Sequence, residues 1–142
     1  MTHETRYAKT ADGPYIAYQV VGSGAIDLAM DFHAFTGNVD LIWEEPDWGP
    51  ILIGLTEFAR LIIHDRRGSG ASSRNVPPPN LETRAADLLV VLDAVGSEAP
   101  VLGAAASTGA MHALFAATNP DRTSGLTWNY PRARLAWAPD YP

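Results

Sequence analysis

The sequence predicts an α/β fold, in which a mostly parallel sheet carries flanking helices within a single domain over residues 1–142. Strand-like and helical segments alternate along the chain, as they do in layered α/β proteins. Ala59–His64 is an almost continuous apolar run, typical of a strand that is buried on both faces. A further observation is that the apolar segment over residues 99–105 leads, through a turn of small residues, directly into an apolar helix.

The first half of the chain favours strands. Residues 6–11 predict an edge strand before the turn Asp12-Gly13-Pro14, and Tyr15–Val21 is β-branched and aromatic. Residues 25–32 predict the next strand. Residues 38–55 contain two prolines and two glycines and predict a broken helix with a loop. We expect the N-terminal strands to form an antiparallel meander and the later strands to be parallel.

The second half alternates more regularly. Asn80 is a favourable N-cap for a helix over residues 81–95, which Gly96 ends. After the strand 99–105, the helix 108–118 stops at Asn119-Pro120, and residues 125–130 predict a last strand. Ligands in such sheets bind beyond the carboxyl ends of the strands, so polar residues that follow strands are expected at one rim.

The junction between strand and helix around Ser107 has the small residues of a nucleophile elbow. Ala105 and Gly109 lie two residues before and after Ser107, where larger side chains would clash in this tight turn. The simpler alternative is close packing of a strand against a helix, which needs small side chains and no chemistry. The motif alone does not separate the two.

Several segments match a known family in order. The matching pieces are Thr5-Arg6-Tyr7-Ala8, Ile16-Ala17-Tyr18-Gln19-Val20, Asp65-Arg66-Arg67-Gly68-Ser69-Gly70-Ala71-Ser72-Ser73, Leu92-Asp93-Ala94-Val95-Gly96 and Trp137-Ala138-Pro139-Asp140-Tyr141-Pro142. With the elbow, they resemble the N-terminal half of an α/β-hydrolase. Within that family, the chain resembles the hydrolase domain found alone or fused to actinobacterial adenylate cyclases. By that resemblance the chain ends before the lid and the last strands.

The resemblance implies roles for particular residues. Ser107 would be the catalytic nucleophile, and the backbone N–H of Thr108, with one from Ala34 or Phe35, would form the oxyanion hole. His33, Asp65 and Arg67 would support the surrounding loops.

Two departures from the family pattern weigh against catalysis by this chain alone. Counting back from the proline that stops the elbow helix places Ala106, not Ser107, opposite the nucleophile, and a methyl group cannot attack a carbonyl. The acid and the histidine base follow the lid in the family, and His112 is the sole histidine after Ser107. The leading hypothesis is therefore an ester or acyl hydrolase by ancestry that is incomplete or inactive as a lone chain.

Other functions stay open to different degrees. A small-ligand binding or sensor module is the main alternative, and a phosphate binder at residues 103–109 is weaker because a P-loop ending is absent. The net charge of −6 and scattered basic residues argue against a nucleic-acid partner. With no cysteine and four dispersed histidines, we expect no metal or other cofactor. We also expect a cytoplasmic, non-membrane protein that forms a homo-oligomer through Trp128, Trp137 and Tyr141.

Overall fold

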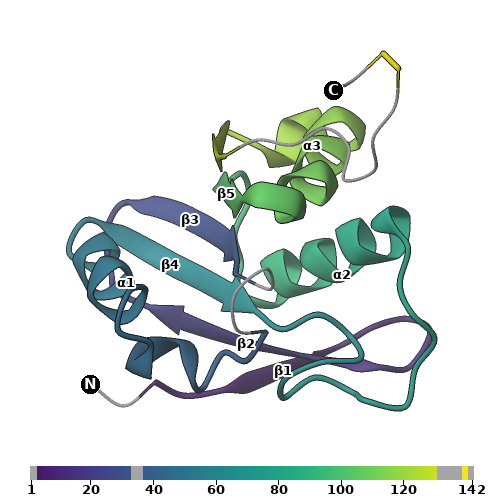
Figure 1. The fold of residues 1–142 in the computed structure, drawn as a ribbon, viewed down its shortest axis with the longest axis horizontal. Helices are drawn as coiled ribbons and strands as arrows, with labels where there is room; N and C mark the ends of the chain where they lie inside the picture. Colours follow the sequence, from purple (N-terminus) through teal and green to yellow (C-terminus); the bar gives the residue numbers. More distant parts are fainter. Residues whose placement is uncertain (1–2, 33–36, 131–138, 141–142) are drawn as a thin grey trace.

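A computed structural model describes residues 3–32, 37–130 and 139–140, and they form one mixed sheet with helices on both faces (Figure 1). The strands are β1 (Arg6–Lys9), β2 (Tyr15–Val21), β3 (Ile26–Asp31), β4 (Ala59–His64), β5 (Val101–Ala105) and β6 (Gly125–Asn129). Their order across the sheet is β1-β2-β4-β3-β5-β6. The predicted fold class is confirmed.

Strand β4 lies between β2 and β3, so the expected meander of consecutive neighbours is wrong beyond the first hairpin. Strands β1 and β2 are antiparallel, and β2 pairs antiparallel with β4. Strand β3 pairs parallel with both β4 and β5, and β5 pairs parallel with β6. The physical reason is burial: Leu28 and Ala29 of β3 point to opposite faces, and both are buried, as in an interior strand.

The helices divide between the two faces of the sheet. On one face, the 3₁₀ turn η1 (Ile42–Glu44) and α1 (Gly49–Thr56) cover a core that contains Leu52 and Leu61. On the other face, α2 (Leu81–Ala94) and α3 (Gly109–Thr118) pack against each other over a core that contains Ile62 and Phe115. Two further 3₁₀ turns are η2 (Ala106–Thr108) and η3 (Pro120–Arg122).

The ends of α2 follow the signals in the sequence. The side chain of Asn80 accepts a hydrogen bond of 2.8 Å from the backbone N–H of Thr83, which satisfies a donor in the first turn. The helix ends at Ala94, one residue before the expected end, and Gly96 follows with a φ of 65°. No helix in the described ranges is long and apolar enough to cross a membrane.

The carboxyl ends of the parallel strands β3, β4 and β5 bring distant residues to one rim of the sheet. Asp31 closes β3, Asp65 follows β4, and Ala106 follows β5. Strand β6 lies at the edge of the described sheet beside β5. This rim is where the candidate site is sought.

Candidate functional site

The turn after β5 is the sharpest feature of the rim. Strand β5 ends at Ala105, η2 spans Ala106–Thr108, and α3 begins at Gly109. Ala106 has a φ of 50°, the left-handed region that alanine adopts at a cost of about 1–2 kcal/mol. Ser107, which follows it within η2, is not among the residues with a positive φ. The strained position of this turn therefore belongs to Ala106.

Two side chains hold the turn in place. Thr108 is buried, and its hydroxyl donates to the Ala105 carbonyl at 2.8 Å while it accepts from the Ala105 N–H at 3.1 Å. From the neighbouring strand β6, the indole N–H of Trp128 donates to the Ala106 carbonyl at 2.8 Å. These bonds satisfy polar backbone groups that the change from strand to helix would otherwise leave unpaired.

Gly109 is small because Trp128 lies against it. A Cβ atom at Gly109 would stand 2.0 Å from the indole Cε2 atom, which is too close for two carbon atoms that are not bonded to each other. The small residue two positions after Ser107 thus has a packing reason that requires no nucleophile. Ser107 itself is half-buried at the turn.

Three residues predicted for the rim, His33, Ala34 and Phe35, lie outside the described residues. The predicted oxyanion-hole partner Thr108 is described, and its side chain bonds to the backbone of β5 as given above. The roles assigned to these residues stay predictions.

Asp65 anchors the loop that follows β4. Its carboxylate accepts the N–H of Ala71 at 2.8 Å, and the hydroxyl of Ser72 donates to its carbonyl at 2.8 Å. Burial raises the pKa of Asp65 to about 6, although the hydrogen bond from Ala71 opposes that shift. The residue thus draws the loop over the end of its strand.

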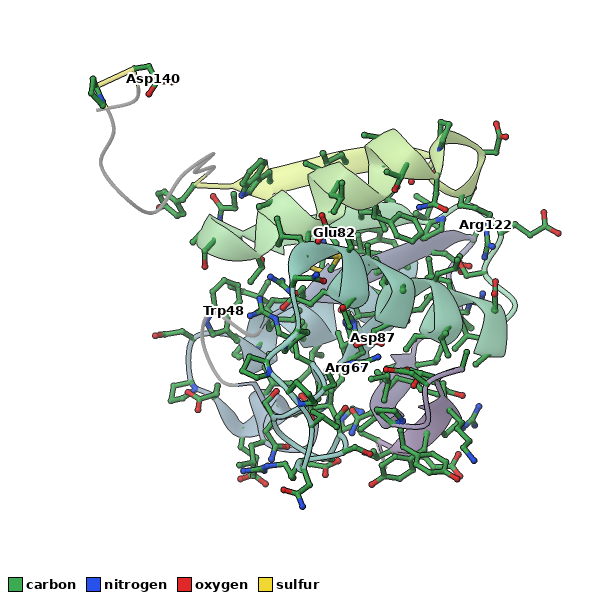
Figure 2. The ribbon with its side chains drawn as sticks, turned by 90° about the vertical axis from the view of Figure 1, so that its right-hand side faces the viewer. Trp48, Arg67, Glu82, Asp87, Arg122 and Asp140 are labelled. Atoms are coloured by element: carbon green, nitrogen blue, oxygen red, sulfur yellow. The ribbon has the colours of Figure 1, made fainter. Side chains whose placement is uncertain are left out.

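Arg67 ties the same loop to two other elements. Its Nε and one terminal nitrogen donate to both carboxylate oxygens of Asp87 in α2, at 2.8 and 2.5 Å (Figure 2). The guanidinium also pairs with Asp12. These bonds raise the pKa of Arg67 and lower that of Asp12. A planar guanidinium that contacts two carboxylates fixes both distance and angle between the elements it joins.

A buried polar cluster beneath the rim was missed by the sequence reasoning. The carboxylate of Asp31, which is 1% exposed, accepts from Arg66 at 3.4 Å and from Arg84 at 3.1 Å. His64 and His112 are buried near these charges, and burial lowers the pKa of both, that of His112 to about 4. The available signal was an aspartate at the end of a strand, directly after the apolar run Leu28–Met30.

One small cavity lies at the rim. A cavity of about 10 Å³ lies beside Phe32, Val39 and Asp65, about the volume needed for one water molecule. Within residues 3–32, 37–130 and 139–140, no three His, Cys, Asp or Glu side chains gather in a way that suits a metal ion.

Similar proteins agree with this architecture. No family model matches the chain. A protein of Caulobacter segnis named "Putative carbamate hydrolase RutD" is 37% identical over 91 residues, which are 59% of this chain and 34% of the relative. The RutD protein of Azorhizobium caulinodans, named in the same words, is 31% identical over 80 residues, which are 56% of this chain and 30% of the relative.

Solved structures extend the similarity over most of this chain. An α/β-hydrolase fold protein from Chitinophaga pinensis matches with a TM-score of 0.73 and 29% identity, covering 89% of this chain and 44% of its own. A hydrolase from Pseudomonas aeruginosa has a TM-score of 0.71 and 25% identity, with 87% of this chain and 44% of its own covered. The chain therefore has the α/β-hydrolase fold, and it spans about a third of the length of the curated relatives it matches.

Proposed function

We propose that this chain is an α/β-hydrolase-type protein whose rim accommodates a small ester or carbamate, and that Ala106 stands where an active enzyme carries its nucleophile. As a lone chain it would bind such a carbonyl compound without cleaving it. The similarity to proteins named as carbamate hydrolases supports the carbonyl class. We also propose that, within this fold, the chain is related to the hydrolase domains associated with actinobacterial adenylate cyclases.

The torsion of Ala106 is the observation that carries the proposal. In this fold the nucleophile occupies a sharp, strained turn between strand and helix, from which its side chain rises above the sheet. Ala106 has the positive φ of such a turn, and its carbonyl is held by Trp128. An alanine methyl has no lone pair with which to attack a carbonyl, so the geometry would be present without the chemistry.

The second candidate is ester hydrolysis with Ser107 as nucleophile. The small residues Ala105 and Gly109 and the half-buried hydroxyl at the turn favour it. The two proposals differ in the oxyanion-hole donor, which is the N–H of the residue after the nucleophile. That donor would be Ser107 in the first case and Thr108 in the second.

A covalent probe separates the two candidates. Wild-type protein, Ser107→Ala and Ala106→Ser would be treated with an alkyl fluorophosphonate, and adducts would be read by intact mass and peptide mapping. We expect no adduct on the wild type or on Ser107→Ala, and a slow single adduct at position 106 in Ala106→Ser. An adduct on Ser107 of the wild type that disappears in Ser107→Ala would instead establish the second candidate.

Binding is measured in the same proteins by NMR. Addition of phenyl acetate or phenyl carbamate should shift the indole N–H resonance of Trp128, because that group bonds to the Ala106 carbonyl. The resonance is assigned with Trp128→Phe. A resonance that stays unchanged at millimolar ligand, with no adduct in any variant, would refute a carbonyl-binding rim.

A further inference from the structure

A basic pocket lies beside the candidate site, between the loop after β4 and the start of α2. Its volume is about 330 Å³, and four of its lining residues are arginines: Arg66, Arg67, Arg74 and Arg84. No acidic residue lines it within the described part of the chain. In a protein with a net charge of −6, such a concentration of guanidinium groups is a local exception.

Two of the arginines compete for a single carboxylate. Arg66 and Arg84 both contact the Oδ2 atom of Asp31, and their side chains are 19% and 11% exposed. Burial lowers the pKa of Arg66, Asp31 opposes that shift, and the charge of Arg84 adds a smaller lowering effect. The Nε–H groups of both have no hydrogen-bond partner among the described residues. The floor of the pocket thus holds more positive charge than Asp31 neutralises.

The other two arginines, Arg67 and Arg74, differ in how firmly their side chains are held. Arg67 is held by ion pairs with Asp87 and Asp12, so it lines the pocket with its charge already balanced. Arg74 is exposed, its guanidinium donates to the Gly70 carbonyl at 2.9 Å, and no ion pair to it occurs within the described ranges. Because this exposed side chain has one hydrogen bond to a backbone carbonyl and no carboxylate partner in the described ranges, Arg74 is able to turn toward a bound anion.

The walls of the pocket are ordered before any ligand arrives. Pro77, Pro78 and Pro79 line one side, and proline has little backbone freedom to lose on binding. The loop is also closed on itself, since the Gly68 N–H donates to the Ser73 carbonyl at 2.8 Å. Preorganised walls reduce the conformational entropy lost when a ligand binds.

We infer that this pocket binds a small oxyanion, the carboxylate or phosphate group of an acidic metabolite, on Arg66, Arg74 and Arg84. Guanidinium groups donate paired hydrogen bonds that match the oxygens of carboxylate and phosphate. An oxyanion would also relieve the excess positive charge beside Asp31. This site does not depend on the proposed function, because none of its residues takes part in the turn at Ala106.

The test is a titration of the full chain followed by backbone amide NMR. Inorganic phosphate, acetate and succinate are added separately at constant ionic strength, with chloride as the reference anion. Arg74→Gln is the main variant, because its exposed side chain forms no ion pair with the described residues and its loss should leave the fold intact. Arg6→Gln, an exposed arginine on β1 that pairs with Glu4, is the matched control.

The expected result is a saturable shift of the backbone amides in residues 66–69, 74–76 and 80–84. Affinity should fall roughly threefold to tenfold in Arg74→Gln, stay unchanged in Arg6→Gln, and weaken as salt is raised. Preference for phosphate or for the carboxylates identifies which group the pocket takes. Shifts that do not saturate, that chloride reproduces, or that are the same in Arg74→Gln and the wild type would overturn the inference.

Discussion

The indole N–H of Trp128 donates a hydrogen bond of 2.8 Å to the carbonyl of Ala106, so strand β6 holds the strained turn that follows β5. Trp128→Phe removes this bond and keeps most of the ring packing against Gly109. We expect the free energy of unfolding to fall by about 1 kcal/mol, the usual contribution of one such bond. Urea denaturation measures this loss. An unchanged midpoint would show that the bond does not stabilise the turn.

Gly109 and Gly54 provide a matched pair of glycine-to-alanine substitutions within helices. A methyl at Gly109 collides with the Trp128 indole, so Gly109→Ala should destabilise the protein by about 1–3 kcal/mol. A methyl at Gly54 of α1 meets no atom within 4 Å, so Gly54→Ala should stabilise it by about 0.5–1 kcal/mol. Thermal unfolding of both variants compares them directly. Equal effects of the same sign would contradict the packing argument.

Asp87 and Asp93, both on α2, separate a buried ion pair from an exposed one. Asp87→Asn leaves the buried guanidinium of Arg67 with Asp12 alone, and we expect a loss of about 3 kcal/mol. Asp93→Asn breaks an exposed pair with Arg122 and should change stability by less than about 1 kcal/mol. Urea midpoints give both values. Comparable losses would mean that Arg67 does not join the loop to α2.

His112 predicts a pH dependence of stability. Burial lowers its pKa from 6.5 to about 4, so between these values the unfolded chain binds a proton that the folded chain does not. Stability should therefore fall as the pH drops from 6.5 to 4, by about 3 kcal/mol from this residue. At pH 7.5, where the histidine is neutral in both states, this loss is absent.

His112→Leu isolates that contribution. Neither ring nitrogen of His112 has a hydrogen-bond partner in the described ranges, so leucine should be neutral or stabilising at pH 7.5. The variant should also lose less stability than the wild type when the pH is lowered to 4.5. Asp65 contributes equally to the pH dependence of stability in both proteins, because its raised pKa is present in each. Parallel pH curves for the two proteins would refute the assignment.

Local signals predicted most of the elements but not their neighbours. The boundaries of β2 and β4 agree with the expected ones, and Asn80 caps α2 as its position indicated. The position of β4 between β2 and β3 could not be read from the chain, because strand order depends on which faces are buried together. Burial on both sides of β3 is a property of the assembled sheet.

The sequence predicted only part of the candidate site, because contacts between residues far apart in the chain depend on the assembled sheet. The small residues around Ser107 and the loop at Asp65 and Arg67 were visible in the sequence. The shared carboxylate of Asp31 was not, since its partners Arg66 and Arg84 are 35 and 53 residues away along the chain. The homo-oligomer stays a prediction: Trp137 and Tyr141 lie outside the described residues, and Trp128 packs on Gly109.

The sequence by itself determined the α/β class and the tight turn after β5, and it limited the nucleophile position to Ala106 or Ser107 without deciding between them, because these features depend on residue size and short-range periodicity. Only the tertiary structure decided which of the two has the left-handed torsion and why Gly109 must be small. The same holds for the basic pocket, whose arginines come from the loop after β4 and from α2. Charges this far apart in the chain meet only once the sheet and its helices have packed.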